Sequence, residues 1–177
     1  MKTVRILLWL PLVAFLIILG FVSSGLLKPH DTTVVSQMVG KPLPAFTLAS
    51  ARAGEGAVTA RGFADGKPRL LNIFGSWCVP CIAEAPQLMA LKQAGVTIEG
   101  IAVRDRPGDV GEFLQRNGDP YDHIGLDDQA VLQIALGSSG VPESFLIDGK
   151  GIIRAQHIGE IRPEDVPALI DTLKAAR

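Results

Sequence analysis

The distribution of apolar and polar residues divides the chain into two regions. Residues 6–22 are nearly all apolar, and no charged residue occurs from Ile6 through Leu27. Beyond residue 40 the apolar residues come in short runs separated by glycine, proline and polar residues, a pattern typical of strands and helices in a compact domain. A chain of 177 residues is long enough for one such domain with an appendage and too short for two separate cores.

The predicted elements of the domain alternate between strands and helices. Arg69–Phe74 is an apolar run of the kind found in a buried strand of a parallel sheet, and residues 50–67 are predicted to form a loop or hairpin. Early alternation followed by a terminal hairpin predicts an α/β fold with a partly parallel sheet and helices on both faces. The predicted strands are 45–48, 69–74, 96–103, 143–147 and 151–157, and the predicted helices are 82–92, 109–117, 128–136 and 163–176.

The apolar segment 6–22 has two interpretations. As a helix it would be about 26 Å long, close to the thickness of a bilayer's hydrocarbon core, and Lys2 and Arg5 favour a cytoplasmic N-terminus. A cleaved signal peptide is the alternative, but its apolar region is usually only about 7–15 residues long. We predict a cytoplasmic segment 1–5, a transmembrane anchor (or uncleaved signal) 6–22, a linker 23–39 and an exported domain 40–177.

Composition and charge argue against several classes of protein. Hydrophobic residues make up 47% and charged residues 20% of the chain, so the domain should be folded. The net charge is −1 without a basic cluster, which argues against nucleic-acid binding. His30, His123 and His157 stand alone and there are two cysteines, too few for a structural zinc site. We predict neither a metal nor a cofactor.

The two cysteines lie in the segment Trp77-Cys-Val-Pro-Cys81, between a predicted strand and a predicted helix. Unpaired N–H groups and the macrodipole at a helix N-terminus stabilise a thiolate on the first cysteine. The second cysteine lies about one turn further, where it can resolve a mixed disulfide. We predict a redox-active Cys78–Cys81 disulfide, with Cys78 as nucleophile and Cys81 as resolving thiol. A purely structural bridge is the alternative, although so short a loop adds little stability.

Further residues give the chain a resemblance to the thioredoxin superfamily. They are the Trp77-Cys-x-x-Cys81 segment itself, Pro86 five residues later, and Val141-Pro142 before a strand. The resemblance implies a thioredoxin-like fold with a mixed central sheet flanked by helices, and a cis peptide bond before Pro142. Three longer segments resemble the cytochrome c maturation thioredoxins of the DsbE/CcmG type: residues 70–78, 118–121 and 141–154.

The resemblance to this group also implies a compartment, partners and a role. Its members are anchored in the bacterial inner membrane by one N-terminal helix, with the C-terminal domain in the periplasm. They reduce the haem-attachment cysteines of apocytochrome c and receive electrons from a membrane thiol reductase. The expected function is therefore that of a specific reductant in cytochrome c biogenesis, with apocytochrome c or its haem-ligation components as partners.

Five residues are candidates for the surroundings of the disulfide. Asn72 stands where ordinary thioredoxins have a buried aspartate, and because an amide takes up no proton, another group must serve as acid–base partner. Glu84 in the predicted helix and Glu143 directly after Pro142 are the candidates, and the alternative is that both are solvated surface acids. A nearby carboxylate would also temper thiol reactivity. Trp77 either shields the disulfide and contacts a partner or packs the loop.

Other functions on the same fold stay open at this point. A general exported disulfide reductase of the TlpA/ResA type would carry the same motif, which does not reveal the reduction potential. A thiol peroxidase would need a Pro-x₃-Thr-x-x-Cys context, which the chain lacks. A copper-binding module is a further alternative, although its relatives use wider cysteine spacing with a nearby histidine.

Overall fold

The structure is a computed structural model, and it describes residues 9, 11–20 and 37–176. The chain divides into two compact units, Met1–Thr32 and Thr33–Arg177. Within the first unit, residues 11–20 are helical and exposed. None of the described helices combines the length and apolarity that a membrane crossing requires. The predicted segment 1–5 lies outside the described residues, as do parts of the predicted anchor 6–22 and linker 23–39.

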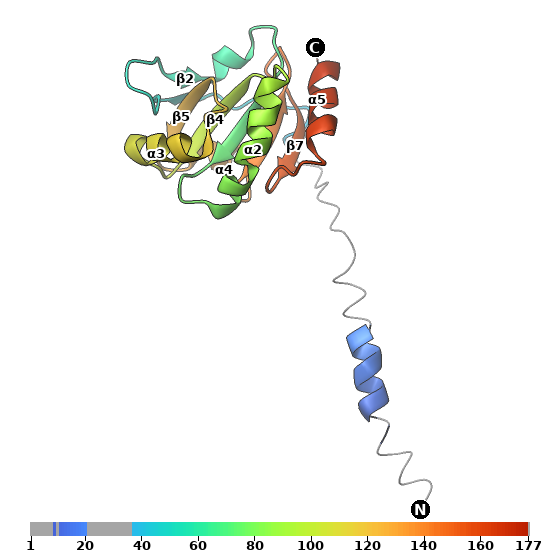
Figure 1. The fold of residues 1–177 in the computed structure, drawn as a ribbon. Coiled ribbons are helices and arrows are strands. Elements are labelled where there is room, and N and C mark those ends of the chain that lie inside the picture. The colour runs from blue at the N-terminus through green and yellow to red at the C-terminus, as the bar shows by residue number, and fades with distance from the viewer. Residues whose placement is uncertain (1–8, 10, 21–36, 177) are drawn as a thin grey trace, which may run out of the picture. The chain divides into compact units, whose positions relative to one another are not determined.

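A five-stranded mixed sheet organises the second unit (Figure 1). Its strands are ordered β5-β4-β3-β6-β7, with β3, β4 and β5 parallel and with β6 and β7 antiparallel to their neighbours. The central strand β3 is buried along its whole length because it has a partner on each side and a packed layer on each face. In chain order the strands are β3 (Arg69–Phe74), β4 (Ile98–Val103), β5 (His123–Asp127), β6 (Glu143–Ile147) and β7 (Ile153–Ile158).

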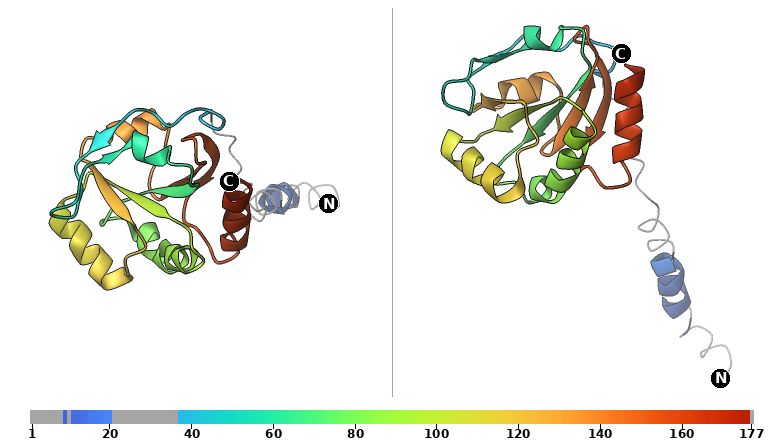
Figure 2. Two further views of the ribbon diagram at one scale, coloured as in Figure 1. Left: turned by 90° about the horizontal axis from the view of Figure 1, so that it is seen from above. Right: turned by 45° about the horizontal axis from the view of Figure 1, so that its top comes forward.

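Two layers cover the sheet, as the expected fold requires (Figure 2). On one face pack α2 (Val79–Gln93), α3 (Pro107–Asn117) and α5 (Val166–Ala175). On the other face pack α4 (Val131–Ala135), the 3₁₀ helix η1 (Ala60–Phe63) and the hairpin of β1 (Thr47–Leu48) with β2 (Val58–Thr59). Side chains of a strand point alternately to its two faces, and β3 therefore supplies both cores.

Strand β5 is the strand of the five-stranded sheet that the sequence analysis did not predict. It forms a parallel edge beside β4, in the register Glu99↔His123 to Val103↔Asp127. The five residues of β5 include only two large apolar side chains, so no clear apolar run marks it in the sequence. Asp127 at its end accepts hydrogen bonds from the backbone N–H groups of Val131 and Gln133. These bonds cap α4, which is shorter than the predicted helix 128–136.

The starts of the other three helices also differ from the prediction, and α3 begins two residues early, at Pro107. Helix α2 begins at Val79 rather than at residue 82, because Cys78 is its N-cap and a proline occupies its first turn. Helix α5 begins at Val166 rather than at Pro163, since residues 163–165 form a turn. The hairpin of β6 and β7 is confirmed. In its turn the N–H of Gly151 donates to the carbonyl of Asp148 at 3.0 Å.

Candidate active site

The junction of β3 and α2 places the two cysteines. Cys78 has an extended backbone (φ −92°, ψ 113°) and caps α2, while a proline occupies the first turn of the helix. A proline is favourable there because the first N–H groups of a helix have no partner within it. The predicted strand–motif–helix arrangement is therefore confirmed at the level of the backbone.

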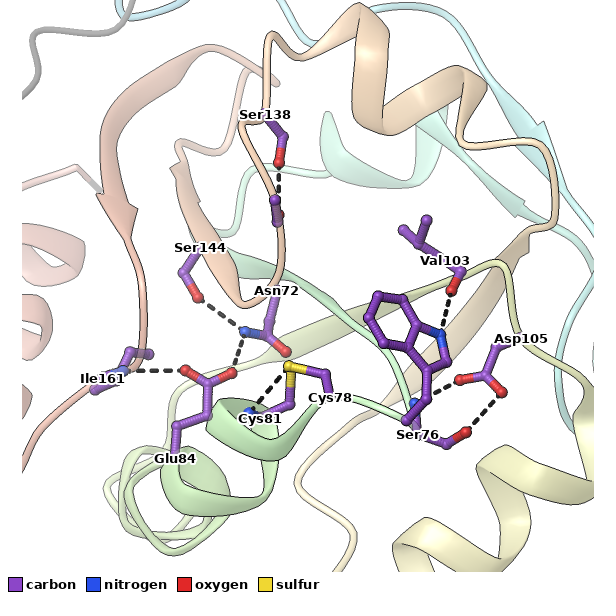
Figure 3. Close-up of a disulfide and its surroundings, with 12 residues drawn as sticks. Asn72, Ser76, Cys78, Cys81, Glu84, Val103, Asp105, Ser138, Ser144 and Ile161 are labelled. Atoms are coloured by element: carbon purple, nitrogen blue, oxygen red, sulfur yellow. Dashed lines mark hydrogen bonds between the residues drawn. A yellow bond between two sulfur atoms is a disulfide. The ribbon is translucent and has the colours of Figure 1, made fainter.

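Cys78 and Cys81 form a disulfide with a Cα–Cα distance of 5.3 Å (Figure 3). Both are buried, with 4% of Cys78 and 1% of Cys81 exposed. The backbone N–H of Cys81 donates to the Sγ of Cys78 at 3.2 Å. Because this N–H belongs to the helix N-terminus, it would stabilise negative charge on Cys78 after reduction of the disulfide.

A buried polar network, here called the Asn72 network, lies on the same face of the sheet as the disulfide (Figure 3). The Nδ2 of Asn72 donates to Glu84 Oε1 and to Ser144 Oγ, both at 3.0 Å. The hydroxyl of Tyr121 donates to Asn72 Oδ1 at 2.8 Å. The backbone N–H of Ile161 donates to Glu84 Oε2 at 3.0 Å. The network thus joins α2, β3, β6 and two loops behind the disulfide.

Glu84 is completely buried in this network. Loss of water raises the pKa of its carboxyl group from 4.5 to about 7. The hydrogen bonds from Ile161 and Asn72 act in the opposite direction because they favour the ionised form, and the charge of Glu160 adds a smaller upward contribution. The interpretation of Glu84 as a solvated surface acid is therefore wrong. With this pKa, the carboxyl group of Glu84 can both accept and donate a proton near neutral pH.

Glu143 is also buried, so the surface interpretation is wrong for it too. Its side chain points to the opposite face of the sheet from its neighbour Ser144. Among the described residues its carboxylate accepts hydrogen bonds from Ser138 Oγ, from the N–H of Ser139 at 3.0 Å and from Gln156 Nε2. Burial raises the pKa of Glu143, and its hydrogen bonds with the 138–140 loop oppose this rise. These contacts connect Glu143 to the loop before Pro142.

Pro142 follows a cis peptide bond, as the resemblance implies. It directly precedes β6, whose register pairs Glu143 with Ile73 near the end of β3. The carbonyl of Pro142 accepts a hydrogen bond from the N–H of Gly159 at 3.1 Å. The proline thus lies beside the end of β3 from which the cysteine loop departs.

Trp77 packs the cysteine loop, which is one of the two interpretations offered by the sequence. Its indole N–H donates to the carbonyl of Val103 at 3.2 Å, and its ring lies so close to Gly75 that a Cβ there would be 2.7 Å from it. The side chain is nevertheless 59% exposed. Its neighbours Val79 and Ile82 are also exposed. An apolar surface therefore adjoins the disulfide, available for contact with a partner.

Residues 38–173 match the sequence model of the Redoxin family. The chain belongs to the Redoxin family. It is 36% identical over 172 residues to the thiol:disulfide interchange protein HelX of Rhodobacter capsulatus, covering 96% of each chain. It is 36% identical over 161 residues to the thiol:disulfide interchange protein DsbE of Tatumella citrea, covering 89% of this chain and 87% of the relative.

A solved structure of the same type supports the assignment. The crystal structure of a DsbE-type protein from Chlorobium tepidum superposes with a TM-score of 0.65 at 30% identity, over 78% of this chain and 96% of that one. With the Cys78–Cys81 disulfide, these similarities identify this redoxin as a thiol–disulfide oxidoreductase.

The sequence analysis missed three residues around the redoxin site. Tyr121 lies within a segment used for the resemblance, but nothing local marks its hydroxyl as a partner of Asn72. Ser144 is likewise marked only by its place in a predicted strand. Asp105 accepts hydrogen bonds from the N–H of Ser76 at 2.6 Å and from Ser76 Oγ at 2.8 Å. It reaches the cysteine loop because the C-terminal ends of parallel strands β3 and β4 meet at one edge of the sheet.

Three cavities in the described domain have volumes of about 500, 370 and 290 Å³. None of them is lined by a cysteine. The disulfide instead lies beside the exposed apolar side chains around Trp77. This surface is available to a macromolecular thiol or disulfide.

Proposed function

We propose that the chain is a membrane-anchored periplasmic reductant of disulfides in apocytochrome c, or in its haem-ligation partner, during cytochrome c biogenesis. The observation that carries the chemistry is a Cys78–Cys81 disulfide at a helix N-terminus with the buried carboxyl group of Glu84 behind it. The cytochrome c role rests on the resemblance of the sequence segments to the DsbE/CcmG group. The relatives named as thiol:disulfide interchange proteins support the exchange reaction.

The reaction starts from the reduced enzyme. The thiolate of Cys78 attacks one sulfur of the substrate disulfide, forming a mixed disulfide and releasing the other substrate sulfur as a thiolate that takes up a proton. Cys81 then loses its proton and attacks the Sγ of Cys78. The second substrate thiolate leaves and is protonated. Two electrons have passed to the substrate, and the enzyme holds the Cys78–Cys81 disulfide.

Glu84 is the proposed proton acceptor for Cys81. It lies one helical turn after Cys81 on α2, and Figure 3 shows its carboxyl group on the disulfide side of the helix. Its pKa of about 7 leaves a substantial ionised fraction at neutral pH to receive the proton. Asn72, on β3, contributes a hydrogen bond to Glu84 instead of a proton site.

The membrane anchor is the second part of the proposal. Residues 11–20 are helical and exposed, and the uncharged run from Ile6 to Leu27 matches the hydrocarbon thickness of a bilayer. In this arrangement residues 1–5 are cytoplasmic, residues 6–22 cross the membrane and residues 23–39 link the anchor to the domain 40–177. An anchored reductant lies next to a membrane thiol reductase, which can return it to the dithiol form in an oxidising compartment.

Deletion of the gene tests the cytochrome c role. We expect the deletion strain to lose most holo-cytochrome c, while other exported disulfide proteins stay intact, because the substrate range is narrow. The wild-type gene and an added small thiol should each restore the cytochromes, whereas the Cys78→Ala variant should not. Haem staining of membrane and periplasmic fractions measures the result. Normal c-type cytochrome levels in the deletion strain would instead favour the general TlpA/ResA-like reductase.

A further inference from the structure

The side-chain amide of Asn72 can face its surroundings in two orientations, related by a half-turn of its terminal bond. In the observed orientation Oδ1 accepts from Tyr121, and the two N–H groups have Glu84 and Ser144 as acceptors. Every polar atom of this completely buried side chain is then satisfied. After a half-turn, Oδ1 would face the ionised Glu84 carboxylate, acceptor against acceptor.

Tyr121 is held rigidly where its hydroxyl meets Asn72. Its ring stacks on Phe74 with a centroid distance of 4.7 Å. Both rings use the space left by Gly100, where an added Cβ would lie 2.9 Å from the Tyr121 ring. Arg52 Nη2 donates to the Tyr121 carbonyl at 3.1 Å, which fixes the backbone as well. Burial raises the pKa of Tyr121 well above 10, so its hydroxyl remains a donor at working pH.

We propose that Tyr121 is a positioning residue for the proton acceptor: its hydroxyl holds the Asn72 amide with the N–H groups turned toward Glu84. This inference rests on the proposed function, in which Glu84 receives the proton of Cys81. Tyr121 acts on Glu84 through Asn72. This orientation of the Asn72 amide, here called the lock, favours the ionised carboxylate of Glu84. An ionised carboxylate accepts hydrogen bonds, whereas a protonated one needs an acceptor of its own.

The other groups that face Glu84 are few among the described residues. The N–H of Ile161 also favours the ionised form of Glu84. Burial and the charge of Glu160 favour the protonated form. On α2 itself the nearest titratable groups are the thiols of the reduced cysteines. Measuring the oxidised protein removes these thiols from the titration. The effect of the amide orientation can therefore be isolated.

The test is a titration of the Glu84 carboxyl carbon by NMR in the full-length, oxidised Tyr121→Phe variant. Once Tyr121 no longer holds Asn72, the amide can turn its oxygen to a protonated Glu84. We expect the midpoint to move upward, with about a tenfold smaller acid dissociation constant. The matched control is Ser144→Ala, which removes the other partner of Asn72 but keeps the lock, and its midpoint should stay close to that of wild type. No upward movement in Tyr121→Phe, or an equal one in both variants, overturns the proposal.

Two further measurements show whether Tyr121 acts through Asn72. In an Asn72→Ala background, Tyr121→Phe should cause no additional movement of the Glu84 midpoint, and a full additional shift would contradict the proposal. In the wild-type chain the Asn72 side-chain nitrogen resonance should titrate together with Glu84, which keeps the test valid if a variant does not fold. An Asn72 side-chain resonance that does not change as Glu84 titrates would also overturn the proposal. Failure of the proposed function would appear separately, as thiol exchange unaffected by Glu84→Gln.

Discussion

Two opposing effects act on the carboxyl group of Glu84, and the loss of water is the larger of them. Removal from water favours its protonated form, and the N–H donors of Ile161 and Asn72 favour its ionised form. A surface glutamate would be fully ionised at neutral pH, and a buried one without donors would remain protonated. Either would be poorly matched to a thiol, whose ordinary pKa is about 8.5. The packing around a single carboxyl group therefore determines whether it can exchange protons with a cysteine.

We expect the stability of the oxidised protein to depend on pH through Glu84. Its pKa is about 7 in the folded protein against 4.5 for the ordinary group, so the folded state binds this proton more tightly. The stabilisation is complete below pH 4.5 and is lost as pH rises through about 7. Relative to Glu84→Gln, the free energy of unfolding of wild type should fall by about 3 kcal/mol across this window.

Urea titrations of both proteins, below and above this pH window, measure the difference. The matched control is Glu164→Gln, which makes the same substitution at an exposed glutamate. A difference between wild type and Glu84→Gln that is the same at every pH would show that Glu84 titrates normally.

The two cysteines should behave differently when one is replaced. Cys81→Ala should accumulate a mixed disulfide with an oxidised substrate, because the Cys81 backbone N–H still stabilises the Cys78 thiolate and no resolving thiol follows. Cys78→Ala should trap little or none. Non-reducing gels and mass spectrometry of the linked peptides measure the adduct. Trapping by Cys78→Ala alone would reverse the assigned roles.

At the scale of elements, the ends of three strands assemble the site. The C-terminal ends of β3 and β4 carry the cysteine loop and the segment of Asp105, and β6 begins beside them after the cis peptide bond. The 138–140 loop, which leads to this bond, is held by the buried carboxylate of Glu143. Its partner Gln156 on β7 ties this loop to the edge of the sheet.

We expect Glu143→Gln to loosen the 138–140 loop. The substituted amide places N–H groups against the donors of Ser138, Ser139 and Gln156, leaving at least one buried donor without an acceptor. Such a loss typically costs about 1–3 kcal/mol of stability. The variant should show faster hydrogen exchange at the amide of Ser139, while the pH profile of thiol exchange stays that of wild type.

Chemical denaturation and amide exchange, followed by NMR, measure this effect. Ser138→Ala is the matched comparison, because it removes one donor and leaves the carboxylate, and its effect should be smaller. If Glu143→Gln shifted the pH profile instead, Glu143 would join Glu84 as an acid–base group of the site.

At the scale of the whole molecule, a folded redox unit follows a short apolar one. The redox unit buries two cores, one on each face of its sheet, which make the strand ends a rigid support for the disulfide. Three of its exposed large apolar side chains, Trp77, Val79 and Ile82, lie at the cysteine loop and the start of α2, while Val39, Val131 and Ile134 are exposed elsewhere. On binding a partner, the surface around Trp77 could contribute both affinity and restriction of access.

The full-length protein should remain in the membrane fraction after washing with high salt or alkali. The apolar segment 6–22 carries no charge, so salt cannot release it. Immunoblots of pellet and supernatant measure the distribution, and a control chain consisting of Thr33–Arg177 should be released. Recovery of a mature soluble form that begins near Gly25 would show a cleaved signal peptide instead.

The sequence by itself determined the features that depend on neighbouring residues. The buried strand β3, the Cys-x-x-Cys motif at the start of α2 and the hairpin of β6 and β7 were predicted because apolar runs, a helix start and turn residues are local signals. Strand β5 was missed because its five residues carry no such signal, and its pairing with β4 is what makes it a strand.

Only the tertiary structure decided which polar residues surround the disulfide. Asn72 and Tyr121 are 49 positions apart, and Glu84 and Ile161 are 77 positions apart, so no local pattern pairs them. Both candidate glutamates were identified from the sequence, but their burial and opposite orientations were not. A pKa near 7 arises from the loss of water and the direction of two N–H groups, and both exist only once distant segments have packed together.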